Sequence, residues 1–310
     1  MRYSISLLPR GLAALAGILW SASVAATAAT FDCRHLQASA TEQVASIDFG
    51  EVPGLVRIPK TISRPPIVLW HGFGAPDSEQ TLMETLPLDD VPAIKVYLGL
   101  PLFGKRAPAG GLDEILRRQR EDLGSLLFEP AVMGAAKELP SVVRSLRARH
   151  CMKPDDPIAL FGFSAGGAAV LFALSQRDVP IDVAVTVNAS TGLSASVEAF
   201  EHATRQTYRW SPHTRELASR ADAELHAVEI ANGHPPPALL IIHGAEDKTL
   251  TPKFAQSLYD TLKPYYAITQ SDQRLQLDLR ARMGHRWPET VELNNLRTSI
   301  AAWFNQPGRQ

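Results

Sequence analysis

Ser164 is the residue whose surroundings indicate chemistry most directly. It stands at the centre of residues 162–166 (GFSAG), which end an apolar run and open onto the small residues 167–170. This pattern is typical of a strand, a sharp turn and a helix, in which the serine takes a strained backbone conformation that presents its hydroxyl. The two glycines allow the strand and the helix to approach each other closely. The pentapeptide alone is equally compatible with a glycine-rich turn between two core elements, so other residues must support a nucleophile.

A serine nucleophile requires a base, nearly always a histidine, and a carboxylate that holds this histidine in the correct tautomer. Of the nine histidines in the chain, His285 lies between the last predicted strand and the last predicted helix. His71 belongs to a glycine turn, and His243 is expected to orient the loop of the predicted acid. The other histidines lie in the N-terminal arm, at a helix end or in a surface segment. We therefore predict that His285 is the base.

Asp247 is the predicted carboxylate because it follows a predicted strand, and open α/β sheets place their sites at the carboxyl ends of strands. Glu246 is the neighbouring alternative, but a turn that directs Asp247 inward would direct Glu246 to solvent. Asp182 begins the predicted strand at 181–187 and lies away from that edge. The same strand ends in the sequence NAS at 188–190, a glycosylation pattern that we interpret as a structural turn.

A second glycine turn, HGFG at 71–74, follows the apolar strand predicted at 67–70. Acyl transfer passes through a tetrahedral oxyanion, and each fixed N–H donor aimed at that oxygen lowers the barrier by about 3 kcal/mol. We predict that the backbone N–H groups of Phe73 and Ala165 form this oxyanion hole, one from each turn.

The elements that must position these residues follow an α/β rhythm. Apolar runs of strand length alternate with helical segments, which predicts a mostly parallel sheet covered by helices on both faces. Two segments interrupt this rhythm: 103–129, whose charges indicate a solvated helical cover, and 191–233, which falls where a small helical cap over the site can be inserted. The predicted strands are 44–49, 55–58, 67–70, 93–98, 158–163, 181–187, 238–242 and 275–282, the first two antiparallel, and the predicted helices are 131–150, 166–175, 251–262 and 289–304.

The N-terminus has the order of charges and apolar residues that is typical of a secretory signal peptide. Arg2 and Arg10 flank polar residues, the segment 11–20 is almost entirely apolar, and small residues follow. We predict a signal peptide at 1–28, with cleavage after the sequence ATA or, alternatively, after the earlier VAA; a buried N-terminal helix is the other interpretation. No stretch is long enough for a comfortable membrane span, so we expect a secreted or periplasmic protein with one domain at 29–310.

The composition excludes some functions and suggests one covalent link. With 31 basic and 32 acidic residues and no long basic run, nucleic acid is not an expected partner. No His-Glu-x-x-His or clustered Cys/His pattern is present, so we expect no metal and no cofactor. In an exported protein, Cys33 and Cys151 are expected to form a disulfide, with two buried free thiols as the alternative.

The chain order Ser164, Asp247, His285, with the HGFG turn at 71–74 upstream, resembles the α/β-hydrolase fold over nearly all of 29–310. This resemblance implies two-step acyl transfer in which the base takes the serine proton, the serine attacks the carbonyl, and water later releases the acid. It requires no metal or organic cofactor.

Within that fold, HGAED at 243–247 and GHRWP at 284–288 resemble the dienelactone-hydrolase and prolyl-oligopeptidase-like esterases. Dienelactone hydrolases use a cysteine nucleophile, whereas this chain has Ser164, so their substrate is not carried over.

The leading functional hypothesis is an exported hydrolase of small or medium carboxylic esters, with Trp210 and Trp287 as candidate substrate-binding residues. A peptidase or amidase is the second hypothesis, although this chain has no room for the propeller domain that the resemblance associates with such peptidases. The third is a non-catalytic binding protein that retains the fold. The presence of Ser164, Asp247 and His285 together argues against the third hypothesis.

Overall fold

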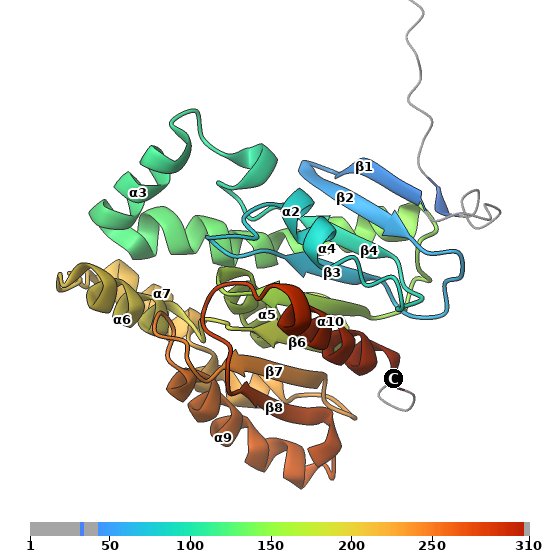
Figure 1. The fold of residues 1–310 in the computed structure, drawn as a ribbon. Coiled ribbons are helices and arrows are strands. Elements are labelled where there is room, and N and C mark those ends of the chain that lie inside the picture. The colour runs from blue at the N-terminus through green and yellow to red at the C-terminus, as the bar shows by residue number, and fades with distance from the viewer. Residues whose placement is uncertain (1–31, 34–42, 307–310) are drawn as a thin grey trace, which may run out of the picture. The chain divides into compact units, whose positions relative to one another are not determined.

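The computed structural model describes residues 32–33 and 43–306, and these form one sheet of eight strands with surrounding helices (Figure 1). The strand order is β1-β2-β4-β3-β5-β6-β7-β8. β2 is antiparallel to both β1 and β4, whereas every pair from β4 to β8 is parallel. The strands are β1 (Gln43–Phe49), β2 (Val52–Ile58), β3 (Ile67–Trp70), β4 (Lys95–Leu98), β5 (Ile158–Phe163), β6 (Ile181–Val187), β7 (Ala238–Gly244) and β8 (Leu275–Arg280).

The central strands are apolar on both sides because helices cover both faces of the sheet. Every residue of β3, β5 and β7 is buried. α2 and α10 pack against one face, where their leucine, isoleucine and aromatic side chains join the main core cluster. α4 and α5 lie on the other face and contact each other, and α8 contacts both α5 and α9 (Figure 1). The mostly parallel sheet and the two antiparallel strands at its start are therefore confirmed.

The predicted helices are present with bounds that shift by a few residues. The largest difference is at α9, which continues past the predicted end at 262 to Ile268 although Pro264 lies inside it. The helix α2 was not predicted; Ser78 begins it with a capping box shared with Thr81. The helices are α2 (Glu79–Thr85), α3 (Gly111–Asp122), a π-helix (Leu123–Met133), α4 (Gly134–Ala148), α5 (Ala165–Gln176), α6 (Leu193–Thr204), α7 (Pro212–Ala221), α8 (Ala227–Ile230), α9 (Pro252–Ile268) and α10 (Thr290–Asn305), with short 3₁₀ turns at Gly104–Arg106, Ala223–His226 and Asp272–Arg274.

The expectation that residues 103–129 form a solvated cover is correct for α3 and wrong for the segment after it. On α3, Glu114 forms ion pairs with Arg117 and Arg118 at the surface. The following π-helix is mostly buried because it contacts α5, α6 and α7. The π-helix is buried because its side chains are mostly apolar, although the segment before it is charged.

The segment 191–233, predicted as a helical cap, contains α6, α7 and α8. Tyr208, in the loop between α6 and α7, donates a hydrogen bond of 2.5 Å to Asp122 and accepts one of 3.2 Å from the N–H of Gly124. Burial and this contact with Asp122 raise the pKa of Tyr208 to about 12, so the phenol keeps its proton at neutral pH. The loop is thereby fastened to the start of the π-helix.

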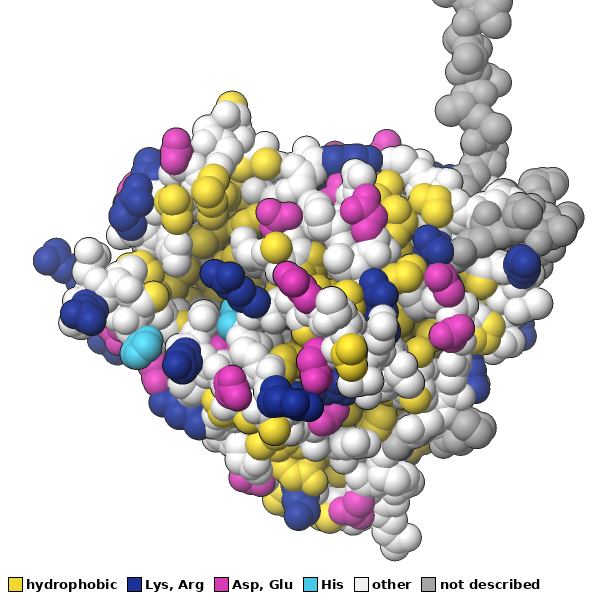
Figure 2. All heavy atoms as spheres, viewed as in Figure 1, with side chains coloured by type: hydrophobic (Ala, Val, Ile, Leu, Met, Phe, Trp, Pro, Cys, Tyr) yellow, Lys and Arg dark blue, Asp and Glu magenta, His cyan; other side chains and the backbone are white. Residues whose placement is uncertain are grey.

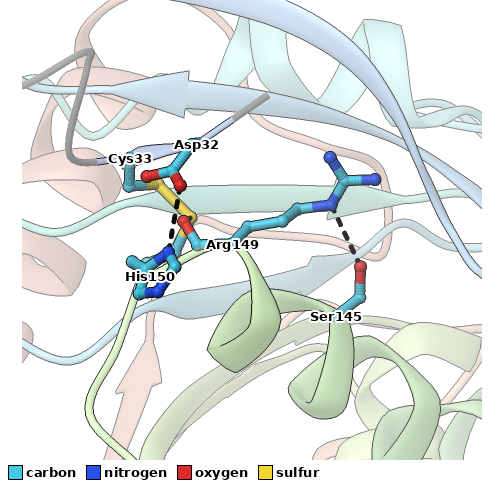
Figure 3. The surroundings of a disulfide bond; sticks show 6 residues. Asp32, Cys33, Ser145, Arg149 and His150 are labelled. Carbon is cyan, nitrogen blue, oxygen red and sulfur yellow. Dashed lines mark hydrogen bonds and ion pairs between the residues drawn. A yellow bond between two sulfur atoms is a disulfide. The ribbon is translucent and has the colours of Figure 1, made fainter. Parts of the chain in front are cut away.

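A disulfide joins Cys33 to Cys151, across a sequence separation of 118 residues (Figure 3). The N–H of Cys33 also donates to the carbonyl of Arg149 at 2.9 Å, and His150 Nδ1 lies 3.0 Å from Asp32 Oδ2. The link ties the segment before β1 to the segment after α4.

The predicted signal peptide at 1–28 lies outside the described residues. Within the residues that are described, no helix combines the length and apolarity needed to span a bilayer.

Candidate active site

Ser164 occupies the sharp turn between β5 and α5. Its φ of 51° and ψ of −114° are strained for a residue with a side chain, as expected for a nucleophile presented at such a turn. A Cβ atom on Gly162 would lie 2.2 Å from the carbonyl oxygen of Gly166, and one on Gly166 would lie 2.4 Å from that of His71. Both positions therefore require glycine because backbone passes directly over them.

The side chains of Ser164, His285 and Asp247 form a continuous chain of contacts. Ser164 Oγ lies 3.1 Å from His285 Nε2, and His285 Nδ1 lies 2.8 Å from Asp247 Oδ2. Asp247 Oδ1 accepts hydrogen bonds from the N–H groups of Thr249 and Leu250 at 2.8 and 2.9 Å. Glu246, the neighbouring alternative, is exposed. The structure thus brings together the three side chains that were identified separately in the sequence.

His243 contacts the same carboxylate oxygen as His285. Its Nε2 lies 2.7 Å from the carbonyl oxygen of Leu250, which can only accept, so Nε2 carries the proton. The same N–H lies 3.3 Å from Asp247 Oδ2. Burial alone raises the pKa of Asp247, but hydrogen bonds from His243, His285 and the backbone outweigh it and hold this pKa well below its usual value. Asp247 is therefore ionised whenever the protein is folded near neutral pH.

The HGFG turn lies against Ser164. A Cβ atom on Gly72 would lie 3.0 Å from the Cβ of Ser164, which shows how closely the turn approaches the serine. His71 is fully buried; its Nε2 accepts from the N–H of Leu100 at 3.0 Å, and its Nδ1 lies 2.6 Å from the carbonyl oxygen of Gly72. Burial lowers the pKa of His71 to about 4, so the imidazole is neutral. Its two contacts support the turn. The ring of Phe73 stacks on that of Phe103 at 4.9 Å.

The loops that carry Asp247 and His285 are joined through their backbones. The N–H of Ala245 donates to the carbonyl of Arg280 at 2.9 Å, and that of Glu246 donates to the carbonyl of Met283 at 3.0 Å. A Cβ atom on Gly244 would lie 2.1 Å from the carbonyl oxygen of Met283. Glycine at 244 therefore allows the two loops to pack in direct contact.

Asn188 is the residue of this region that the sequence reasoning missed. Its side chain bonds to the loops of both Asp247 and His285, and it is fully buried. The glycosylation pattern at 188–190 is therefore inaccessible in the folded protein, in agreement with its interpretation as a structural turn. The signal in the sequence was positional: an amide side chain ends a strand that lies between β5 and β7 in the sheet.

Trp287 and Trp210, the candidate substrate-binding residues, make the contacts of packed side chains. The ring of Trp287 lies edge-on to those of Phe161 and Phe163, at 6.3 and 5.1 Å, and borders the main core cluster. Trp210 lies edge-on to Tyr208 at 5.0 Å within its own segment. Trp287 therefore packs at the edge of the core and Trp210 packs within its own segment, both partly exposed, and a role of either ring in substrate binding stays a prediction.

A hollow opens beside α3 on the face drawn in Figure 2, and hydrophobic side chains gather along it. On α3, Leu112 and Leu116 are 70% and 37% exposed.

The described residues were also considered as metal ligands. Within the described ranges, no cluster of three or more histidine, cysteine or acidic side chains is suited to hold a metal ion.

A sequence model of the prolyl oligopeptidase family matches residues 135–307, the range that contains Ser164, Asp247 and His285. No curated protein sequence matches the chain.

Solved structures share its fold. TT1662 from Thermus thermophilus is similar with a TM-score of 0.64 and 15% identity, over 86% of this chain and 99% of TT1662. The acylaminoacyl peptidase of Pyrococcus horikoshii has a TM-score of 0.54 and 16% identity, over 84% of this chain and 40% of the peptidase. An esterase of the bacterial hormone-sensitive lipase family has a TM-score of 0.52 and 18% identity, over 86% of this chain and 84% of the esterase. The chain thus has the α/β-hydrolase fold.

Proposed function

Because the chain belongs to the prolyl oligopeptidase family and is a hydrolase of the α/β-hydrolase type, we propose that it cleaves carboxylic esters with Ser164 as the nucleophile. One observation supports this most directly: Ser164 Oγ, the His285 ring and the Asp247 carboxylate are in contact at 3.1 and 2.8 Å. These distances are those of a nucleophile, a base and the carboxylate that orients the base.

In the proposed reaction, His285 donates its Nδ1–H to Asp247 and thereby presents an unprotonated Nε2 to Ser164. Nε2 takes the hydroxyl proton as Oγ attacks the ester carbonyl, and returns it to the alcohol oxygen as the alcohol leaves. Water then attacks the acyl-enzyme, with His285 again as base, and releases the acid and free Ser164. Asp247 stays ionised throughout because its pKa is held well below neutral.

The oxyanion of each tetrahedral intermediate is assigned to the N–H groups of Phe73 and Ala165. Ala165 is the first residue of α5, so its N–H is not used inside the helix. Phe73 follows Gly72, whose close approach to Ser164 places the turn beside the nucleophile. The neutral His71 supports this turn through its contacts with the N–H of Leu100 and the carbonyl oxygen of Gly72.

Two observations support an ester substrate and export. The hollow beside α3, along which hydrophobic side chains gather, suits an apolar acyl or alcohol group (Figure 2). The Cys33–Cys151 disulfide suits an oxidising compartment such as the periplasm or the exterior. The proposed partner is therefore a small-molecule ester.

A fluorophosphonate probe and p-nitrophenyl esters test the proposal. The purified protein should be labelled at Ser164 and release nitrophenol from short acyl esters, and Ser164→Ala should abolish both. Ser175→Ala is the matched control, since Ser175 is also buried but lies near the end of α5, where its hydroxyl donates to the carbonyl of Phe172 and accepts from Nε2 of Gln176. An intact, folded sample that is not labelled would refute a catalytic function.

The family also contains peptidases, so the same protein must be tested on aminoacyl and prolyl amides. We expect a kcat/KM for the best ester at least 100-fold above that for the best amide. The reverse order would replace the esterase proposal with a peptidase.

A further inference from the structure

Asn188 lies in the turn after β6, between the strand that carries Ser164 and the strand that leads to Asp247. It has a φ of 46°, a left-handed conformation that asparagine adopts more readily than most residues. The side chain is fully buried, so each of its polar atoms needs a protein partner.

The amide group of Asn188 connects the two loops of the site. Its Nδ2 donates to the carbonyl oxygens of Gly284 and His285, at 2.8 and 3.1 Å. Its Oδ1 accepts from the N–H of Gly244 at 2.8 Å. The amide N–H groups therefore donate to the loop that carries His285, and the amide oxygen accepts from the segment that leads to Asp247.

The turn around Asn188 also holds the backbone of the nucleophile. Ser164 donates its N–H to the carbonyl of Val187 at 2.9 Å and accepts at its own carbonyl from Ser190 at 3.3 Å. Ala189 is packed so closely that a Cβ on Gly167 would lie 2.4 Å from its Cβ. One short turn thus contacts the elements of all three proposed catalytic residues.

We propose that Asn188 is a positioning residue that sets the distance from His285 to Asp247 and Ser164. The inference rests on the proposed function. Asn188 bonds to the backbone carbonyls of His285 and of its neighbour Gly284, so the loss of these bonds removes restraints from the backbone that carries the base. A displacement of about 1 Å at a catalytic group lowers a rate by about 100-fold.

Asparagine is required chemically, because the site needs donors and an acceptor on one short side chain. Aspartate has nearly the same shape and still accepts from Gly244, but when ionised it faces two carbonyl oxygens without a proton to donate. Glycine suits the φ of 46° and removes all three bonds. The two variants therefore remove the positioning bonds in different ways while keeping the backbone conformation.

The experiment measures kcat and KM for a p-nitrophenyl ester in Asn188→Asp, Asn188→Gly and Ser190→Ala. Rates are divided by the sites titrated with a fluorophosphonate, so that unfolded protein does not contribute. Ser190 is the matched control: it is buried in the same turn, but its hydroxyl bonds to Gly192 and Ser196, away from both catalytic loops.

We expect kcat to fall about 100-fold in both Asn188 variants, with KM within about threefold of wild type, and to change less than threefold in Ser190→Ala. Two further results should accompany this. The low-field proton resonance between His285 and Asp247 should broaden or vanish in the Asn188 variants only. The activity of Asn188→Asp relative to wild type should rise as the pH is lowered, because protonation gives the carboxyl group a donor again.

A kcat within threefold of wild type in the Asn188 variants would overturn the proposal, as would an equal fall in Ser190→Ala. If Asn188→Asp does not fold, Asn188→Gly decides by the same criteria. Active wild-type protein with unaffected variants refutes the positioning role alone, whereas wild-type protein that neither hydrolyses esters nor reacts with the probe refutes the proposed function as well.

Discussion

Asp247 is buried and Asp182 is partly buried, and the two aspartates lie at opposite ends of neighbouring strands. Asp182 is near the start of β6, where its Oδ1 accepts from Arg274 at 2.6 Å and, among the described residues, its Oδ2 has no hydrogen-bond partner. Asp247 follows the carboxyl end of β7, where both of its oxygens are contacted by N–H groups, namely those of Thr249, Leu250, His243 and His285.

The pKa values of the two carboxyl groups are consequently shifted in opposite directions. Burial raises the pKa of Asp182, and the single cation of Arg274 does not offset it. Burial also raises the pKa of Asp247, but its N–H donors outweigh this and lower the pKa overall. The four N–H donors around Asp247 thus favour its ionised form, which is the form that can orient a histidine, whereas the contact with Arg274 leaves the pKa of Asp182 raised.

At the amino ends of the parallel strands, the polar contacts join separate segments of the chain. Arg274 also donates to the carbonyls of Pro236 and Asp182, at 2.6 and 3.2 Å, and so connects three segments of the chain. Cys151 of the disulfide lines the same surface cavity as Asp182. We expect substitutions at the amino end to change stability and those at the carboxyl end to change catalysis.

The largest effect is expected from Asp247→Asn. The amide turns a donor toward His285 and favours the wrong tautomer, so kcat should fall about 10⁴-fold, and the free energy of unfolding should fall by about 3 kcal/mol because a carboxylate whose pKa is held well below its usual value loses its charge. Ester hydrolysis and urea unfolding measure the two quantities. Glu246→Gln is the matched control because Glu246 is exposed, and it should leave kcat within about twofold. An Asp247→Asn enzyme with a tenth of the wild-type kcat would contradict the assignment.

Removal of the disulfide tests the other end. In the double variant Cys33→Ser, Cys151→Ser, a loop closed across 118 residues is released, so the free energy of unfolding should fall by about 4 kcal/mol. The kcat per titrated site at 25 °C should stay unchanged. A fall in kcat per titrated site would show that the two ends of the sheet are not independent.

Asp182→Ala should lower the free energy of unfolding by about 3 kcal/mol, because the buried guanidinium of Arg274 loses the oxygen that accepts its hydrogen bond. Its kcat should match that of the wild type, in contrast to Asp247→Asn. Asp178→Ala, at an exposed position close by in the chain, should change stability by less than about 0.5 kcal/mol. Equal stability of the Asp178 and Asp182 variants would remove the structural role of the ion pair.

The smallest effect concerns pH and His71. Its pKa is lowered to about 4 when folded, so the unfolded chain binds the proton first as the pH falls below about 6.5. Stability from this group is complete above pH 6.5 and should decrease by about 2 kcal/mol between pH 7 and pH 5. Urea unfolding of wild type and His71→Gln at both pH values isolates this loss, which should be absent in the variant. A loss of equal size in His71→Gln would assign it to other groups.

Much of the site could be predicted because its signals are local. A nucleophile turn requires glycine at fixed offsets from Ser164, and those glycines are visible in any chain that builds the turn. The positions of Asp247 and His285 followed from the rule that sites lie at the carboxyl ends of parallel strands. The core packing of Trp287 was not predictable, since aromatic residues near a site serve a pocket or a core equally well.

The sequence by itself determined that the chain forms a mostly parallel sheet with antiparallel strands at its start. It also determined which residues are able to do chemistry, because periodicity and turn sterics act over a few neighbouring residues. Only the tertiary structure decided which polar groups support them. The bonds from Asn188 to Gly244 and Gly284 span 56 and 96 residues, and burial of the π-helix depends in part on α6 and α7, which begin about 60 and about 80 residues after its end. Such contacts leave no local pattern: they arise when strands that are distant in the chain become neighbours in the sheet, and every buried amide there must then find a partner.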